Sequence, residues 1–94
     1  MKSIVEGKRY DTEKAELIAS NRYFDGKSMD RGGRNSFLYK TKKGNFFMHY
    51  TTRWEGEREA IVPLTLEEAA EKYEILYEKE VEFEDAFGYS PEEA

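Results

Sequence analysis

The chain has 94 residues, of which 38% are hydrophobic, 15% aromatic and 37% charged, and its net charge is −5. This length fits one small domain spanning residues 1–94, and the aromatic share argues for a folded chain, because disordered chains are poor in aromatics. The absence of cysteine excludes disulfides, thiol catalysis and Cys-ligated zinc, and no stretch is long and apolar enough to span a membrane. Residues 1–6 lack the apolar core of a signal peptide, so we expect a cytoplasmic protein.

The first third of the chain predicts a short hairpin followed by an ambiguous segment. Residues 3–5 and 8–10 flank Glu6-Gly7, a dipeptide suited to a tight turn. Residues 11–16 begin with Asp11 and Thr12, either of which could cap one turn of helix. Residues 17–20 either extend that helix or begin a strand. Residues 25–35 hold three glycines among mixed charges, which predicts an exposed loop.

The clearest predicted element is a second hairpin in the middle of the chain. Residues 36–41 and 45–52 are rich in β-branched and aromatic residues, and the Lys-Lys-Gly sequence at 42–44 supplies the turn. Phe46 and Met48 fall on one face of the second strand, whereas Phe47 and His49 fall on the other. Because both faces carry large side chains, we expect a central hairpin that a helix covers on one side.

A strand and an acidic helix follow. Residues 60–64 form a short strand, which Pro63 confines to a sheet edge or a strand end. Thr65 and Glu68 have the spacing of a capping box. The helix should run over about 66–79, since apolar residues recur there at helical spacing: Leu66, Ala69, Ala70, Tyr73, Leu76 and Tyr77.

Past this helix, the apolar residues at 81, 83 and 87 indicate either an extended segment or a second helical turn, which Gly88 would end, and the last residues should fray. The predicted fold class is therefore α+β: an antiparallel sheet of four to five short strands packed against one amphipathic acidic helix.

Charge is distributed unevenly along the chain. Residues 1–66 hold 13 Lys or Arg and 9 Asp or Glu, a net of +4, whereas residues 67–94 hold 2 Lys and 11 Asp or Glu, a net of −9. The predicted partner-binding residues are the acidic side chains of the helix and of the segment after it: Glu67, Glu71, Glu74, Glu78, Glu82 and Glu84. Such a row can attract a basic surface, although a solvated acidic face that only keeps the protein in solution has the same pattern.

The middle of the chain has the opposite charge. Residues 22–43 carry seven cations against two Asp, and aromatic residues lie beside them, a combination found in single-strand binders. The corresponding nucleic-acid-binding residues are Arg34, Lys40, Lys42 and Lys43. The acidic balance of the whole chain disfavours direct nucleic-acid binding, because phosphate contacts dominate that affinity, and the aromatic residues equally fit a small core.

Catalysis is the third hypothesis, and it depends on the lone imidazole, His49. A general base needs a partner and a cleft, and no nucleophile motif or phosphate-binding loop accompanies it. A structural histidine in a hairpin explains the pattern as well. Glutamates along one helix diverge from any single point, so no metal site or other cofactor is predicted. The chain is therefore expected not to be an enzyme.

Three stretches together resemble a family of small proteins encoded on phages, conjugative elements and plasmids of Gram-positive bacteria. They are GKRYDTEKAELI at 7–18, LYKTKKGNFF at 38–47, and IVPLT at 61–65 leading into the acidic helix. The resemblance covers residues 4 to 80 and carries no catalytic residues over. It implies a bacterial host and the setting in which anti-CRISPR proteins occur, some of which present acidic surfaces to the nucleic-acid channel of an RNA-guided complex.

Charge and context together predict a non-enzymatic inhibitor of a host nucleic-acid-processing defence complex, acting by nucleic-acid mimicry. The partner would be a host protein or ribonucleoprotein with a basic surface, without membrane association. The alternative is a nucleic-acid-binding or regulatory accessory protein of the mobile element, acting through the basic hairpin. A homodimer formed through a sheet edge stays open, since no particular residue argues for it.

Overall fold

The computed structural model describes residues 2–21, 34–52, 56 and 58–89, and all structural statements refer to these. The predicted loop at 25–35 and the predicted frayed tail lie almost wholly outside them. The elements in chain order are β1 (Lys2–Val5), β2 (Lys8–Asp11), β3 (Glu16–Ser20), β4 (Arg34–Lys40), β5 (Phe46–Thr52), β6 (Ala60–Leu64), α1 (Leu66–Ile75), β7 (Glu78–Lys79) and α2 (Phe83–Phe87).

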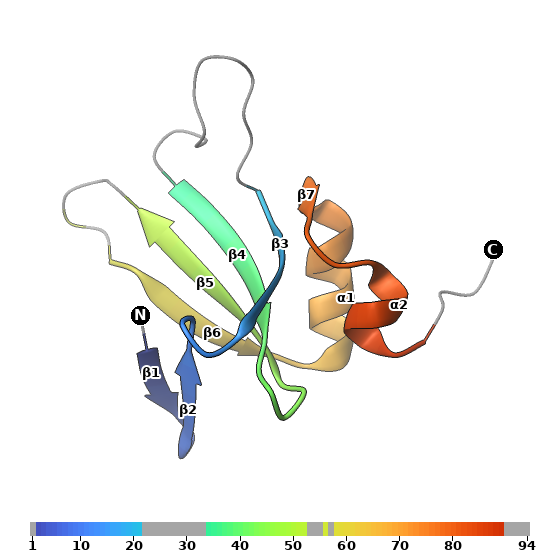
Figure 1. The fold of residues 1–94 in the computed structure, drawn as a ribbon. Coiled ribbons are helices and arrows are strands. Elements are labelled where there is room, and N and C mark those ends of the chain that lie inside the picture. The colour runs from blue at the N-terminus through green and yellow to red at the C-terminus, as the bar shows by residue number, and fades with distance from the viewer. Residues whose placement is uncertain (1, 22–33, 53–55, 57, 90–94) are drawn as a thin grey trace.

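The fold is α+β, as the sequence predicts. Five antiparallel strands form one sheet in the order β6-β5-β4-β3-β7, and β1 and β2 form a separate two-stranded hairpin. In Figure 1, α1 and α2 lie beyond one side of the large sheet, and the β1–β2 hairpin lies at the lower end of the sheet, next to β6. The described residues contain no helix long and apolar enough to cross a membrane, since the longest, α1, has 10 residues.

The two predicted hairpins are confirmed, and both turns depend on left-handed backbone. Glu6 and Gly7 have φ values of 50° and 77°, which is the pattern of a tight hairpin turn between β1 and β2. Gly44 has a φ of 89° in the β4–β5 turn, where its N–H donates to the Thr41 carbonyl at 2.9 Å. Glycine adopts this conformation without the steric cost that a Cβ atom imposes.

The main core lies between the large sheet and the two helices. Ile18, Leu38 and Met48 come from the central strands, and each is at most 1% exposed. Tyr73 and Phe87 pack on them from α1 and α2. The Phe87 ring stacks on Phe46 at 4.7 Å between centroids, so the short second helix is part of the core.

The opposite face of the sheet is covered by the small hairpin. Phe47 is fully buried there, between the stacked ring of Tyr39 at 5.3 Å and the edge of Tyr10 at 5.4 Å. Tyr10 belongs to β2 and is 6% exposed. The predicted division of β5 into two apolar faces is therefore confirmed, and β2 covers part of the face that the helices leave open.

The first ambiguous segment resolves as a turn followed by a strand. Residues 12–15 form a turn without helix, in which the Asp11 carboxylate accepts from the Glu13 N–H at 3.0 Å. The helical interpretation of residues 11–16 is wrong, because β3 begins at Glu16 and pairs with β4. The pairing register shifts between Leu17 and Ala19, which marks a bulge at Ile18.

The predicted helix end is also wrong. The capping box at Thr65 is confirmed, but α1 ends at Ile75, and Leu76 is already extended with a ψ of 132°. The chain turns so that β7 can pair with β3. Tyr77 therefore leaves the predicted apolar stripe and is 65% exposed, whereas Leu76 stays in the core at 3%. Between Phe83 and Phe87 the second helical turn is the alternative that forms.

Candidate functional site

The predicted acidic row is spread over three elements. Glu67, Glu71 and Glu74 lie exposed on α1, Glu78 lies on the short strand β7, Glu82 is the N-cap of α2, and Glu84 lies in the first turn of α2. The expectation that Glu78 continues the helical row is wrong, because the helix ends before it. All six carboxylates nevertheless remain exposed on the part of the chain that follows the sheet.

Three of these carboxylates act electrostatically on Tyr73. The buried Tyr73 ring packs against Phe83 and Phe87 at 5.5 and 5.7 Å, and its hydroxyl donates to the Val81 carbonyl at 2.8 Å. Burial raises the pKa of the Tyr73 phenol above 10, and the negative charges of three glutamates raise it further: Glu82, Glu74 and Glu84. Carboxylates from α1, the N-cap of α2 and α2 itself therefore all disfavour ionisation of one buried hydroxyl.

Only two cations belong to residues 66–89, and both are held close to the acidic helix. Lys79 donates to the Leu76 carbonyl, which is left open where α1 ends, and its ammonium lies 5.0 Å from the centroid of the Tyr73 ring. Lys72 is half-buried on α1 and interacts with Glu68. We call the exposed carboxylates of this region the acidic surface: Glu67, Glu71, Glu74, Glu78, Glu82 and Glu84.

The residues of the predicted basic site differ in their contacts. Lys40 ends β4 on the helix side, where its ammonium donates to the Ala86 carbonyl at 2.7 Å and lies 5.7 Å from the centroid of the Phe46 ring. Its side chain thus connects β4 to α2, a structural role that the nucleic-acid-binding prediction did not include. Arg34 begins β4 opposite Thr52 of β5, and its side chain lies outside the description.

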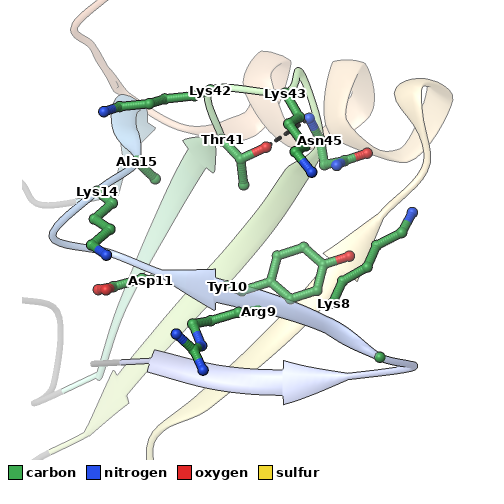
Figure 2. Close-up of a pocket in the computed structure, with 11 residues that line it drawn as sticks. Lys8, Arg9, Tyr10, Asp11, Lys14, Ala15, Thr41, Lys42, Lys43 and Asn45 are labelled. Atoms are coloured by element: carbon green, nitrogen blue, oxygen red, sulfur yellow. Dashed lines mark hydrogen bonds between the residues drawn. The ribbon is translucent and has the colours of Figure 1, made fainter.

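Lys42 and Lys43 instead line a pocket that the sequence does not announce. This pocket has a volume of about 440 Å³ and lies between β2, the turn after it and the β4–β5 turn. Figure 2 shows β2 along one side of the pocket and the turn that carries Thr41 and Asn45 along the other. We call it the basic pocket, because five of its six charged lining residues are cationic: Lys8, Arg9, Lys14, Lys42 and Lys43, with Asp11 as the acid.

Sequence reasoning missed Lys8, Arg9 and Lys14 because it looked for a local cluster of cations only within residues 22–43. The signal that could have found them is the first hairpin, whose Gly7 turn is followed at once by two cations. The order of the elements along the chain does not reveal that this hairpin packs against the second one. The contact between Tyr10 and Phe47 joins the two hairpins.

His49 is packed among aromatic rings of the sheet and paired with one carboxylate. It is 9% exposed, lies near the rings of Phe37 and Tyr39 at 6.1 and 6.4 Å, and places Nε2 3.0 Å from the Glu59 carboxylate. Among the described residues, no three His, Asp or Glu side chains cluster as metal ligands would.

Comparison with protein families, curated proteins and solved structures finds no match to this chain.

Proposed function

We propose that this chain is a non-enzymatic binding protein whose acidic surface docks on a basic, nucleic-acid-binding groove of a host protein or ribonucleoprotein. Bound there, it would exclude the nucleic acid and inhibit the complex, in the manner of an anti-CRISPR protein. The origin in a phage or another mobile element remains part of this proposal.

The observation that carries the proposal is the acidic surface itself: its six carboxylates are all exposed, and residues 66–89 supply only two lysines against them. Like charges brought together repel, and a surface selected for stability alone would intersperse them with cations. In this region Lys79 donates to the Leu76 carbonyl and Lys72 interacts with Glu68, and these two lysines leave the net charge of residues 66–89 negative. An acidic field of this kind favours encounter with a basic partner and loses that effect as salt screens it.

The core beneath the acidic surface supports the same proposal. Tyr73, Phe83 and Phe87 pack ring to ring, with centroids 4.5 to 5.7 Å apart. The carboxylates of α1 and α2 are therefore carried on a packed aromatic cluster. A fixed arrangement of charge loses less conformational entropy on binding than the same charges on a mobile tail.

The test is capture of host-lysate proteins on the immobilised chain, at about 50 mM and about 500 mM salt, before and after addition of competing DNA. The expected result is a partner that is identified as a nucleic-acid-binding protein, elutes at the higher salt and is displaced by DNA. The variant E74K/E82K/E84K should lose it, while keeping the wild-type circular dichroism spectrum.

The matched control is E6K/E13K/E16K, which changes net charge equally at exposed glutamates of the first hairpin, the turn after it and β3. It should retain the partner. Equal loss in both variants would show that only total charge matters, and retention by E74K/E82K/E84K would refute the acidic surface as the binding site.

A further inference from the structure

The basic pocket is separate from the acidic surface and plays no part in the function proposed above for that surface. It lies beside Tyr10, on the face of the sheet opposite the helix core, so the two sites occupy different sides of the sheet. Its volume of about 440 Å³ falls in the range of small-molecule sites, which is about 300–1,000 Å³.

The charges of the pocket are free to take a ligand. Lys8, Lys14, Lys42 and Lys43 are all exposed, and none of them forms an ion pair with another residue of the described segments. The single acid, Asp11, has a carboxylate oxygen occupied by the N–H of Glu13. The pocket therefore carries an uncompensated positive charge.

The walls of the pocket are fixed by hydrogen bonds and packing. In the upper wall, the Thr41 hydroxyl accepts from the Asn45 N–H at 3.0 Å, and the Thr41 N–H donates to the Asn45 carbonyl at 2.8 Å. In the lower wall, Tyr10 is held by Phe47. Figure 2 shows Lys8 and Tyr10 directed from β2 towards the turn, whereas Arg9 points to the other side of the strand.

The chemistry of these walls favours a particular class of anion. Lysine ammonium groups bind phosphate as point charges, and several of them in one concavity match several charges on a small ligand. The carboxylates of an acidic peptide are spread along an extended chain, whereas a polyphosphate concentrates its charge within a few ångströms. The Tyr10 ring is only 6% exposed and packs on Phe47, so it offers no free face for stacking a base.

We infer that the basic pocket binds clustered phosphate groups, recognised by Lys8 and Lys14 from the β2 side and by Lys42 and Lys43 from the β4–β5 turn. Recognition depends on phosphate and is indifferent to the base. A nucleoside triphosphate carries such a cluster, whereas the backbone of a single-stranded nucleic acid supplies one phosphate per nucleotide, and the experiment distinguishes these two sources. This inference does not rest on the function proposed for the acidic surface.

The experiment titrates the full chain by calorimetry, at about 50 mM salt, with tripolyphosphate, ATP, GTP and AMP. Tripolyphosphate, ATP and GTP should bind with similar affinity and AMP at least about tenfold more weakly, because AMP offers one phosphate in place of three. A fluorescent ten-nucleotide oligo-dT without terminal phosphates tests the second source. Saturable binding of oligo-dT that tripolyphosphate displaces assigns the pocket to a strand, and saturation by the triphosphates alone assigns it to a nucleotide.

The variant K8Q/K43Q removes one cation from each wall and should weaken binding of the preferred ligand about tenfold. The matched control K2Q/R58Q removes two exposed cations that do not line the pocket and should bind as wild type. E74K/E82K/E84K should also bind normally, which separates this result from the fate of the acidic surface.

Three outcomes would overturn the inference. The first is no saturable binding of either tripolyphosphate or oligo-dT. The second is equal weakening in K8Q/K43Q and K2Q/R58Q, which would mean that net charge alone is sensed. The third is a glutamate-rich peptide that binds as tightly as tripolyphosphate, which would assign the pocket to protein partners.

Discussion

The ammonium of Lys40 donates to the carbonyl oxygen of Ala86 at 2.7 Å, across 46 residues of sequence. Ala86 lies in the last turn of α2, where carbonyls have no partner within the helix. A strand residue thus completes the hydrogen bonding of a helix end, and the attachment of α2 to the sheet depends partly on one lysine.

Replacing this lysine should therefore affect stability and leave phosphate binding intact. K40M keeps an apolar stem but loses the charged donor, and we expect the free energy of unfolding to fall by about 1 kcal/mol. Urea denaturation measures this. The matched variant K42M lies in the exposed turn and should change stability by less than about 0.5 kcal/mol. Equal effects of K40M and K42M would contradict the structural role of Lys40.

The capping box at the start of α1 predicts an effect at acid pH. The Thr65 hydroxyl accepts from the Glu68 N–H at 3.1 Å, and the Thr65 N–H donates to the Glu68 carboxylate at 2.9 Å. The Thr65 N–H and hydroxyl hold the pKa of Glu68 below its ordinary value of 4.5. The stabilising effect of ionised Glu68 is therefore present above about pH 4.5 and is lost as the pH falls through the lowered value.

Two variants separate the parts of this box. T65A should cost about 1 kcal/mol at neutral pH, because it leaves an N-terminal N–H of the helix without its acceptor. E68Q should remove only the acid-dependent part, so the difference between wild type and E68Q should shrink as the pH is lowered from 6 to 3. Thermal melts across this range measure it. A stability difference between wild type and E68Q that does not change with pH would show that the Glu68 carboxylate does not accept from the Thr65 N–H in solution.

Tyrosine burial predicts an effect at alkaline pH. Burial raises the pKa of both Tyr73 and Tyr39, and nearby glutamates add to the effect at Tyr73. Because the folded state disfavours the ionised phenol, this stability is fully present below pH 10 and is lost as the pH rises above 10 through the raised value. Y73F should lose about 1 kcal/mol at pH 7 with the bond to Val81, yet lose less stability than wild type between pH 10 and 12.

The control for this prediction is Y39F, which removes a phenol whose pKa is raised by burial alone. Between pH 10 and 12, Y39F should also lose less stability than wild type, but without the contribution of the glutamates. In the E74Q/E82Q/E84Q background, the alkaline profiles measured with and without Y73F should move closer together. An unchanged gap would mean that the three carboxylates do not act on Tyr73.

The second helix should be indispensable to the fold. Phe87 stacks on Phe46 and Phe83 at 4.7 and 4.5 Å and is 9% exposed. F87A should lower the free energy of unfolding by about 3–5 kcal/mol. Because a domain of this size has little more stability than that, F87A should be close to unfolded. F87L keeps most of the volume and should cost roughly 1–1.5 kcal/mol, so it remains measurable by denaturation. A tolerated F87A would contradict a core that includes α2.

The elements predictable from sequence are those set by local chemistry. The turns at Gly7 and Gly44 and the cap at Thr65 depend on residues within four positions of one another, and all three form as predicted. The end of α1 depends on a distant partner. The apolar period continues to Tyr77, but the pairing of β7 with β3 diverts the chain after Ile75.

The same distinction explains the two sites. The acidic residues are close in sequence, so their presence on one region could be predicted, although their division among α1, β7 and α2 could not. The basic pocket joins Lys8 and Lys14 to Lys42 and Lys43 through the packing of Tyr10 on Phe47. No periodicity in the sequence encodes that contact between two hairpins.

The outer strands of the large sheet have a consequence for how the protein behaves at high concentration. Pro63 is the fourth of the five residues of β6 and pairs with Phe47, and its missing N–H removes a donor from the strand at the sheet's edge. At the other edge, β7 is only two residues long. A template for strand-by-strand growth needs a long row of open donors and acceptors. Because neither edge strand offers such a row, the apolar segment AIVPL can lie at the edge of the sheet without serving as a template for fibril formation.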